Sequence, residues 1–454
     1  MRRATFITGT AAMVLLEAVS IAYSTMQPPT VRPVGEATLL EYAGAYQWGS
    51  NTFVYLQLWD EFSGFGQPRQ LTAFDESGEV RTLYPIDRDQ FFAGPGAAVP
   101  TSIQSRIEFE RDRTGKITSL TWRREGAAPR TARRGEIETR EDVRFSNGNI
   151  QLTGTLIAPT TGRRHPAIIL VHGSGAENRD YILPFARFLI RCGMAVLGYD
   201  KRGVGGSTGD WNTASFDDLA GDVVAAVEYL KARDDIDRTQ IGLLGVSQAG
   251  WIMPLAAVRA KGLAFLISIS GAAVPAAETT IDQALNEMTA TGMKRETVAD
   301  VVTLMRLQYR FAQTAQGWDD YAAARETLAA RLGGTPPKTF PALPDDPYFQ
   351  FIRRLYFYDP TPTLRQLRVP TLALFGELDN NIVAEKNKSA WEAALRAGGN
   401  RDYTLKILPK ADHYQWEAKV GSNAEMASLQ RVVPEYFTTI QDWLGKRIKG
   451  FRAY

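Results

Sequence analysis

One short stretch, residues 241–254 (IGLLGVSQAGWIMP), constrains the fold more than any other part of the chain. Its first half is apolar and bounded by glycine, which is typical of a strand buried on both faces of a parallel sheet. Ser247 follows this strand, between Gly245 and Gly250, and a helical pattern follows the serine. A serine with small neighbours between a strand and a helix is the pattern of a nucleophile elbow, in which a sharp turn lifts the hydroxyl clear of the sheet. The fifth position of the elbow is Ala249, where glycine is usual, and an ordinary Gly/Ser turn is the alternative.

Composition indicates which class of protein contains this serine. A chain of 454 residues predicts two or three domains, and 44% hydrophobic with 22% charged residues is typical of a globular protein with a full-sized core. The net charge of +2 is spread through the chain, which gives no basic surface for nucleic acid. The single cysteine, Cys192, excludes an internal disulfide and a zinc site built from cysteines. We expect Cys192 to be a small buried residue at the end of a helix.

Histidine is rare, and chemistry that depends on it has only three candidates, His165, His172 and His413. His165 precedes a proline, so we expect it to lie exposed on a sheet edge. His172 stands at the end of the strand pattern AIILVH, and we expect it to pack beneath the loop that follows. His413 therefore stays as the candidate base.

The N-terminus has the pattern of a secretory signal peptide. Arg2 and Arg3 precede a largely apolar stretch, and Ala22-Tyr23-Ser24 is a small-x-small cleavage site. We therefore predict that residues 1–24 are a signal peptide and that the chain is exported to the bacterial periplasm or beyond. Glu17 interrupts the apolar stretch, so an uncleaved anchor or a docked helix is the alternative. No other segment approaches the length of a membrane span, so we expect no stable span in the mature chain.

Residues 25–125 predict a small all-β domain. Short runs of branched and aromatic residues alternate with turns in this part of the chain. We expect its aromatic residues to be core rather than a sugar-binding platform; they include Trp48, Trp59, Phe91 and Phe92. Residues 126–141 are rich in Arg and Glu and poor in apolar residues, which predicts a solvated linker.

Residues 142–275 and 362–454 predict an α/β domain with a doubly wound, mostly parallel sheet. A hairpin with Asn147-Gly148 at its bend comes first, and strand patterns then alternate with helical ones. One helix begins after Ser215, where Asp218 completes a capping box. The alternation stops at residues 276–361, which have a helical pattern. We expect this insertion to form a cap above the carboxyl ends of the strands.

An aspartate and a histidine follow two later strand patterns, both after the serine in the chain. Asp379 follows LALFG and His413 follows YTLKIL, so the order in the chain is Ser, Asp, His. Since the carboxyl ends of parallel strands meet at one crevice, we expect these three side chains to come together. A serine hydroxyl needs an imidazole to take its proton, and the imidazole needs a carboxylate to orient it. Glu377 and Asp412 are the rival acids. We expect the chain at Glu377 to be still leaving the strand, and Asp412 to be unable to reach back to the ring of its neighbour His413.

An oxyanion that develops on the substrate needs two backbone amides. We expect one from Gln248, directly after the serine, and the other from Ser174 in the glycine-rich loop His172-Gly173-Ser174-Gly175. The glycines of YDKRGVGGSTGDW lack a full phosphate-binding motif, so we interpret this segment as a structural loop near the mouth of the site.

With these residues in place, the chain from about Glu141 onward resembles the α/β-hydrolase serine hydrolases of the prolyl oligopeptidase and dienelactone hydrolase-like branch. The blocks LTGTL, LVHGSG, YDKRGVGGS, GVSQAGW, LFGELD and ADHY carry the resemblance. It implies Ser247 as nucleophile, Asp379 as acid and His413 as base. The line IEFERDRTGKITSLTW resembles the last hairpin of lipocalin-like accessory domains found with some bacterial serine hydrolases. The departures are Ala249 in the elbow and a small β domain in place of a large propeller.

The sequence thus predicts a carboxylesterase that acts on a small-molecule ester through an acyl-enzyme intermediate. This chemistry needs no cofactor and no metal, and the pattern predicts no oligomeric state. The first alternative is a serine peptidase with the same three residues, for which Asp345 and Asp346 in the cap are candidates to bind a charged peptide terminus. The second is a non-catalytic binding protein on the same scaffold.

Overall fold

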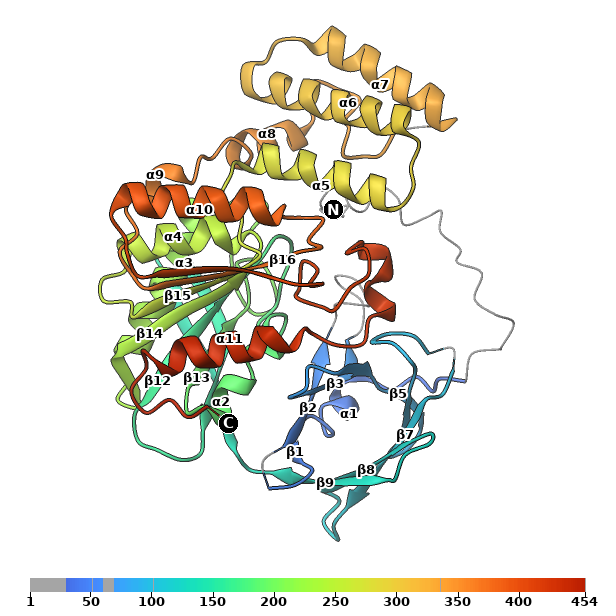
Figure 1. The fold of residues 1–454 in the computed structure, drawn as a ribbon, viewed down its shortest axis with the longest axis vertical. Coiled ribbons are helices and arrows are strands. Elements are labelled where there is room, and N and C mark those ends of the chain that lie inside the picture. Colours follow the sequence, from blue (N-terminus) through green and yellow to red (C-terminus); the bar gives the residue numbers. More distant parts are fainter. Residues whose placement is uncertain (1–29, 51, 60–68, 101, 335, 454) are drawn as a thin grey trace.

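The computed structural model of the chain describes residues 30–50, 52–59, 69–100, 102–334 and 336–453. The predicted signal peptide, residues 1–24, lies outside the described residues. Within these ranges, no helix combines the length and the apolar character that crossing a bilayer requires. Two β-sheets lie side by side, and a group of helices stacks at one end of the molecule (Figure 1).

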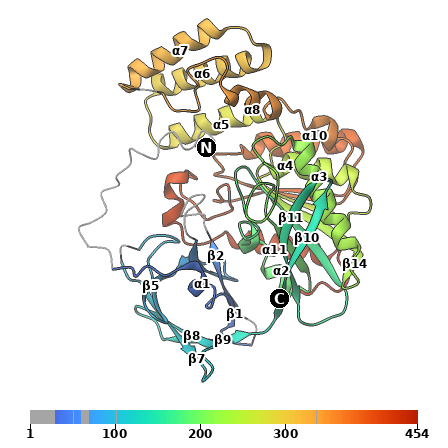
Figure 2. The ribbon, with the colours of Figure 1, turned by 180° about the vertical axis from the view of Figure 1, so that it is seen from behind.

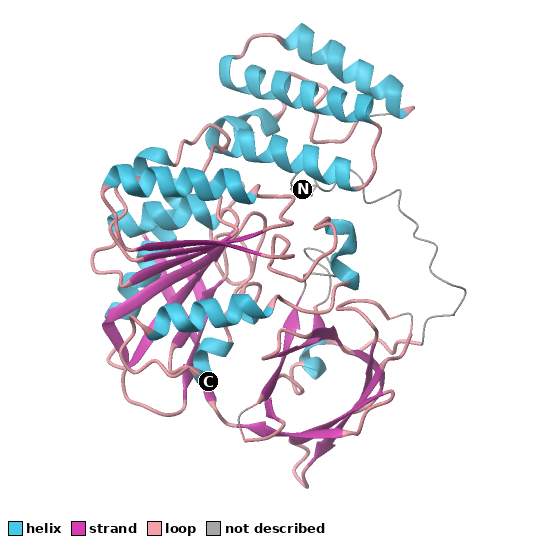
Figure 3. Ribbon diagram, viewed as in Figure 1, coloured by secondary structure: helices cyan, strands magenta, loops and turns pink. Residues whose placement is uncertain are grey.

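The first sheet has nine antiparallel strands and curls into a barrel-like shape (Figure 3). Its order is β4-β3-β2-β1-β9-β8-β7-β6-β5. The strands are β1 Gly44–Gln47, β2 Phe53–Trp59, β3 Gln70–Asp75, β4 Val80–Thr82, β5 Tyr84–Asp87, β6 Gln90–Ala93, β7 Ser105–Arg111, β8 Ile117–Arg124 and β9 Arg130–Gly135. The short helix α1 (Glu36–Leu39) packs Leu39 against the barrel core. We call residues 36–135 the barrel domain.

The aromatic residues of the barrel domain are core, as predicted. Phe91 and Phe92 are at most 1% exposed, and Trp48 is partly buried against the barrel core. Trp59 is 3% exposed, and it packs with Phe74 of β3 and with side chains of the second sheet rather than with the barrel core. Trp59 therefore connects the barrel domain to the second sheet.

The prediction that residues 126–141 form a solvated linker is wrong. β9 pairs with β1 on one side and with β8 on the other, and β10 begins at Glu138. The strand has the alternation of a half-buried surface, because Ala132 is fully buried while the residues on either side of it are exposed. Charged side chains that point to water leave the backbone ladder intact, so a composition rich in Arg and Glu concealed a strand.

The second sheet has eight strands in the order β10-β11-β13-β12-β14-β15-β16-β17. β10, β11 and β13 pair antiparallel, and every other neighbouring pair is parallel, which confirms a mostly parallel sheet. The strands are β10 Glu138–Asn147, β11 Ile150–Pro159, β12 His165–Val171, β13 Ala195–Tyr199, β14 Ile236–Val246, β15 Phe265–Ile269, β16 Thr371–Gly376 and β17 Tyr403–Leu408.

Two local predictions in this sheet need correction. The bend of the first hairpin lies one residue later than predicted, because Asn147 pairs with Ile150 and Gly148 alone has a positive φ of 58°. His165 is buried, at 7% exposure, rather than exposed on an edge. β12 pairs on both sides, and the register shifts between His165 and Ala167, so an irregularity accommodates the intervening proline inside a central strand.

Helices cover both faces of the second sheet, which confirms the doubly wound arrangement (Figure 2). Side chains of α3, α4 and α10 pack on one face, and those of α2 and α11 on the other. The helices are α2 Phe188–Arg191, α3 Phe216–Lys231, α4 Ala249–Arg259, α10 Ala384–Gly398 and α11 Pro434–Gly445. The predicted capping box is present, since the Asp218 amide donates to Ser215 Oγ and the Ser215 amide to the Asp218 carboxylate. Cys192 caps the end of α2 and is fully buried, as predicted.

The segment between β15 and β16 is helical. It contains α5 Ala276–Ala290, α6 Arg295–Thr314, α7 Trp318–Leu332, α8 Pro347–Leu355 and α9 Thr361–Leu364. Ring contacts among Phe311, Trp318 and Phe349 hold α6, α7 and α8 together. In both views α5 to α8 stack at the end of the molecule beyond α4 and α10 (Figures 1 and 2).

Candidate active site

Ser247 occupies a sharp turn between β14 and α4. Its φ is +59°, a left-handed conformation that is costly for any residue with a side chain. The Ser247 amide donates to the carbonyl of Ile269 at 3.0 Å, so the neighbouring strand holds the strained residue in place. The segment therefore has the sharp strand–serine–helix turn that the sequence pattern predicts.

Small residues around the serine are required by close packing. A Cβ on Gly245 would lie 2.4 Å from the Ala249 methyl, and one on Gly250 would lie 2.5 Å from the Ala272 amide nitrogen. Both distances are too short for any side chain at these glycines. The Ala249 methyl itself is fully buried, so the space left open by Gly245 accommodates the departure from the usual pattern.

Asp379 and His413 form a buried pair at the carboxyl ends of β16 and β17. Nδ1 of His413 lies 3.0 Å from both carboxylate oxygens of Asp379, and each residue is at most 6% exposed. The amides of Asn381 and Ile382 donate to Asp379 Oδ1 at 2.9 and 2.7 Å and fix its orientation. Because a carboxylate only accepts hydrogen bonds, Nδ1 of the ring carries the proton and Nε2 is the basic nitrogen.

The two rival carboxylates are held by other partners. Glu377 Oε2 accepts a hydrogen bond from the Lys410 amide at 2.8 Å. Asp412 Oδ1 accepts from the amides of Tyr414 and Trp416 at 2.9 and 2.8 Å. Burial raises the pKa of Asp412 to about 7, and the nearby charge of Asp379 acts in the same direction. Asp412 thus fixes the loop that carries the histidine.

A cavity of about 140 Å³ brings the predicted residues together. Ser174, Ser247, Gln248 and His413 all line it, although they follow three different strands. Helices of the insertion supply the opposite wall, with Thr279, Thr280 and Gln283 from α5 and Phe351 and Leu355 from α8. Much of the remaining wall is apolar or aromatic, from Tyr181, Ile182, Phe216, Trp251, Tyr356 and Ile382.

Two backbone amides on the cavity wall are available to a ligand. No described residue accepts a hydrogen bond from the amide of Ser174 or of Gln248. By contrast, the Gly173 amide donates to Glu177 Oε2 at 2.8 Å. An unpaired amide beside a cavity is a ready donor, so the geometry agrees with the two oxyanion donors that we predict.

Lys201 is a site residue that the sequence analysis missed. Its ammonium donates to the carbonyls of Gly173 and Gly175 at 2.7 and 3.0 Å and to Gln248 Oε1 at 3.2 Å, and the residue is only 2% exposed. Burial lowers the pKa of Lys201 to about 8, while the charges of Glu177 and Asp222 act against the fall. In the sequence it was one more charge in a glycine-rich segment. Only the fold brings it against the loop that carries Ser174.

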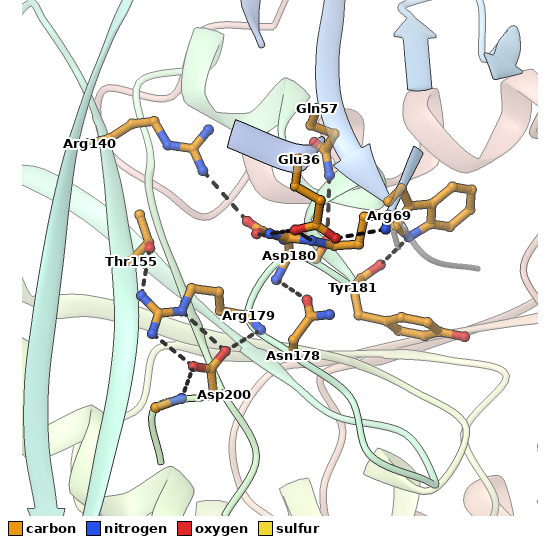
Figure 4. A network of polar contacts seen from close by, with 12 residues as sticks. Glu36, Gln57, Arg69, Arg140, Thr155, Asn178, Arg179, Asp180, Tyr181 and Asp200 are labelled. Carbon is orange, nitrogen blue, oxygen red and sulfur yellow. Dashed lines mark hydrogen bonds and ion pairs between the residues drawn. The ribbon is translucent and has the colours of Figure 1, made fainter. Parts of the chain in front are cut away.

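Asp200 and Arg202, the charged residues on either side of Lys201, are paired with other side chains of the protein. Arg179 pairs with Asp200 at 2.8 Å (Figure 4), and Arg202 pairs with Asp222 at 2.7 Å. Asp200 Oδ2 also accepts the Gly206 amide. These contacts agree with a structural loop, which is the interpretation that we favoured over phosphate binding.

Two remaining expectations concern His172 and the pair Asp345 and Asp346. His172 is buried, and its ring packs edge-on against Tyr199 with centroids 4.7 Å apart, as expected for a packing residue. Asp345 and Asp346, the candidates for binding a peptide terminus, do not line the cavity, and Asp346 instead accepts the Tyr348 amide at the start of α8. Within the described ranges, no three His, Cys, Asp or Glu side chains are arranged to hold a metal ion.

Comparison with known proteins identifies the family of the chain and several related proteins. A model of the alpha/beta hydrolase family matches residues 168–422. The chain is 30% identical to the quorum-quenching protein AidA of Acinetobacter baumannii over 128 residues, which are 28% of this chain and 42% of AidA. It is 25% identical to the esterase EstD of Thermotoga maritima over 269 residues, 58% of this chain and 57% of EstD. The chain therefore spans about half the length of the curated relatives it matches.

Among solved structures, the chain is similar to the alpha/beta hydrolase GrgF from Penicillium sp. sh18. The TM-score is 0.44 at 21% identity, over 68% of this chain and 99% of GrgF. The esterase Pf2001 of Pyrococcus furiosus has a TM-score of 0.44 at 16% identity, over 68% of this chain and 91% of Pf2001.

Proposed function

Because the chain belongs to the alpha/beta hydrolase family, we propose that it is a serine hydrolase that cleaves carboxylic esters. The observation that carries the proposal is the buried Asp379–His413 pair, which lies at the same cavity as Ser247 and two unpaired amides. These are the parts that acyl transfer requires: a nucleophile, an oriented base and an oxyanion hole.

In the first half of the reaction, Ser247 Oγ attacks the carbonyl carbon of the ester and His413 Nε2 takes the hydroxyl proton. The oxyanion that forms receives hydrogen bonds from the amides of Ser174 and Gln248. Asp379 stabilises the imidazolium. When the bond to the alcohol breaks, the leaving alkoxide takes the proton from His413, and the acyl group stays on Ser247.

In the second half, water attacks the acyl-enzyme and gives its proton to His413. The bond between the acyl carbon and Ser247 Oγ then breaks, the serine regains its proton from the imidazolium, and the carboxylic acid leaves. Lys201 holds the loop of Ser174 and the side chain of Gln248 through both halves. It is a positioning residue, because its ammonium bonds to the protein rather than to the substrate.

An ester fits the cavity better than a peptide. The wall is largely apolar and aromatic, which suits an acyl chain. Glu177 is the acidic residue of the wall, and it is already engaged by the Gly173 amide. Similarity to the esterase EstD supports the same substrate class.

Covalent labelling tests the proposed nucleophile. An alkyl fluorophosphonate is expected to modify wild-type protein on Ser247, located by peptide mass spectrometry, because the reagent mimics the tetrahedral intermediate at an activated serine. The variant Ser247→Ala is expected to stay unlabelled. Labelling of a folded Ser247→Ala variant at the same rate would contradict the site.

A further inference from the structure

Trp59 belongs to the barrel domain but lies outside the barrel core, where its ring also contacts Phe74 of β3. It is the last residue of β2, on which Val54, Leu56 and Leu58 contribute to the barrel core. Side chains alternate along a strand, so Trp59 points to the opposite face. It is 3% exposed and joins the hydrophobic cluster of the second sheet.

This one side chain contacts two of the segments that border the active-site cavity, those of Tyr181 and His413. Trp59 Nε1 donates to the carbonyl of Tyr181 at 3.0 Å, and Tyr181 lines the cavity. The Trp59 ring stacks on Trp416, with centroids 6.5 Å apart and planes 15° apart. Trp416 is three residues after His413, and its amide bonds to Asp412 in the same loop.

A second contact from the barrel domain holds the Tyr181 segment, which we define as residues 172–182. Arg69 Nη1 pairs with Asp180 Oδ2 at 2.9 Å, and Glu36 pairs with Arg69 at 3.1 Å (Figure 4). Gln57 Nε2 also reaches the Asp180 carbonyl, at 3.4 Å. Asp180 is thus bound from the barrel side through its side chain and its backbone.

The Tyr181 segment needs such support because it has no regular structure of its own. It lies between the end of β12 at Val171 and the short helix η2 (Leu183–Phe185). Its position therefore depends on side contacts rather than on a helix or strand ladder. The Tyr181 hydroxyl lies 3.3 Å from the Tyr414 hydroxyl, so the segment also contacts the residue after His413.

We propose that Trp59 is a positioning residue through which the barrel domain sets the place of Tyr181, and thereby the size of ester that the cavity accepts. The inference rests on the proposed function and gives the barrel domain a part in substrate choice. The aromatic side chain supplies both the packing against the His413 loop and the hydrogen bond to the cavity wall.

The variant Trp59→Phe tests this role, since it keeps an aromatic ring but removes the N–H donor. We measure kcat and KM for p-nitrophenyl esters of increasing acyl length, together with Tm. We expect kcat/KM to change by about fivefold to tenfold, and unequally for short and long esters, because losing one buried hydrogen bond lets Tyr181 shift. Trp122→Phe in β8 is the matched control, expected to leave the ester profile unchanged, because Trp122 packs against the barrel core.

A double-mutant cycle separates positioning from general damage. In a Tyr181→Ala background, Trp59→Phe is expected to lose its effect on the ester profile, because the side chain that it positions is absent. Arg69→Met, which removes the contact to Asp180, is expected to change the profile in the same direction and replaces Trp59→Phe if that variant fails to fold.

The proposal is overturned if folded Trp59→Phe and Arg69→Met keep the wild-type ester profile, or if the effect of Trp59→Phe persists unchanged with Tyr181→Ala. Failure of the proposed function appears separately, as ester hydrolysis that survives Ser247→Ala. The rate at which an alkyl fluorophosphonate of short or long chain modifies Ser247 gives a second readout for every variant, independent of turnover.

Discussion

Replacing Lys201 by Met should impair catalysis far more than stability. The substitution keeps an unbranched chain of similar length in a site that is 2% exposed, and it removes the three hydrogen bonds of the ammonium. Two of these bonds hold the carbonyls on either side of Ser174, so the amide of Ser174 loses its support. Removing one oxyanion donor costs about 3 to 4 kcal/mol in other hydrolases, so we expect kcat to fall by about 100-fold to 1000-fold.

The stability of the protein should respond differently, because the charge of Lys201 is itself costly. Burial lowers its pKa from 10.5 to about 8, which means that the native state disfavours the charged form by about 3 kcal/mol. Lys201→Met removes this cost of the buried charge, but each carbonyl left unpaired destabilises the variant by about 1 to 3 kcal/mol. The two effects oppose each other. The free energy of unfolding of Lys201→Met should therefore lie close to that of the wild type at neutral pH.

The pH dependence gives a second signature. Between about pH 8 and 10.5 the unfolded chain still holds the Lys201 proton while the native state has released it, so this group makes the wild type more stable as pH rises. Activity should change in the opposite sense, because a neutral amine holds the two carbonyls less strongly than an ammonium. Lys201→Met should lack both trends.

The assay is the initial rate on a p-nitrophenyl ester across this pH range, with urea unfolding of the same samples. Lys116→Met is the matched control, because Lys116 lies on the exposed turn between β7 and β8 with a side chain 62% exposed. A folded Lys201→Met variant with kcat/KM near that of the wild type, and with the same alkaline profile, would refute the reasoning.

Three further predictions concern the buried groups Asp379, Asp412 and Cys192. Asp379→Asn is expected to lower kcat by about 10⁴-fold, because the amide no longer orients the imidazole, whereas Asp412→Asn keeps an acceptor for two amides and should retain activity. Burial raises the pKa of Asp412 to about 7, so ionisation of this group lowers the stability of the wild type as pH rises from about 4 to 7. Asp412→Asn should remove this loss of stability. Urea unfolding of both proteins at about pH 4 and pH 7 measures it. Burial raises the pKa of Cys192 to about 12, so a disulfide reagent at about pH 8 should modify it only after unfolding, and modification of the native protein would contradict its burial.

Much of the fold was predictable because its signals are local. The capping box at Ser215 and the run of apolar residues before Ser247 each depend on residues a few positions apart, and both appear in the structure. The order of Ser247, Asp379 and His413 placed them at strand ends, and the sheet brings those ends to one edge. Here chain order and strand direction were sufficient.

The failures share a physical cause, which is that side-chain contacts over long sequence distances leave no local pattern. Lys201 meets Gly173 only because their loops adjoin, and Trp59 meets Tyr181 across the boundary between the two sheets. His165 was misplaced because a proline suggested an edge strand, whereas the irregularity that accommodates the proline is a matter of register. The charged β9 strand was hidden because only Ala132 on it is fully buried.

The central claim is tested most directly by running wild type and Ser247→Ala together on a p-nitrophenyl ester series and on a panel of aminoacyl p-nitroanilides. We expect ester turnover in the wild type, lost by about four orders of magnitude in the variant, with the anilides untouched. Anilide turnover that depends on Ser247 would instead identify a peptidase. Ester turnover that persists in folded Ser247→Ala, or no turnover of either substrate class by the wild type, would contradict the proposed serine esterase.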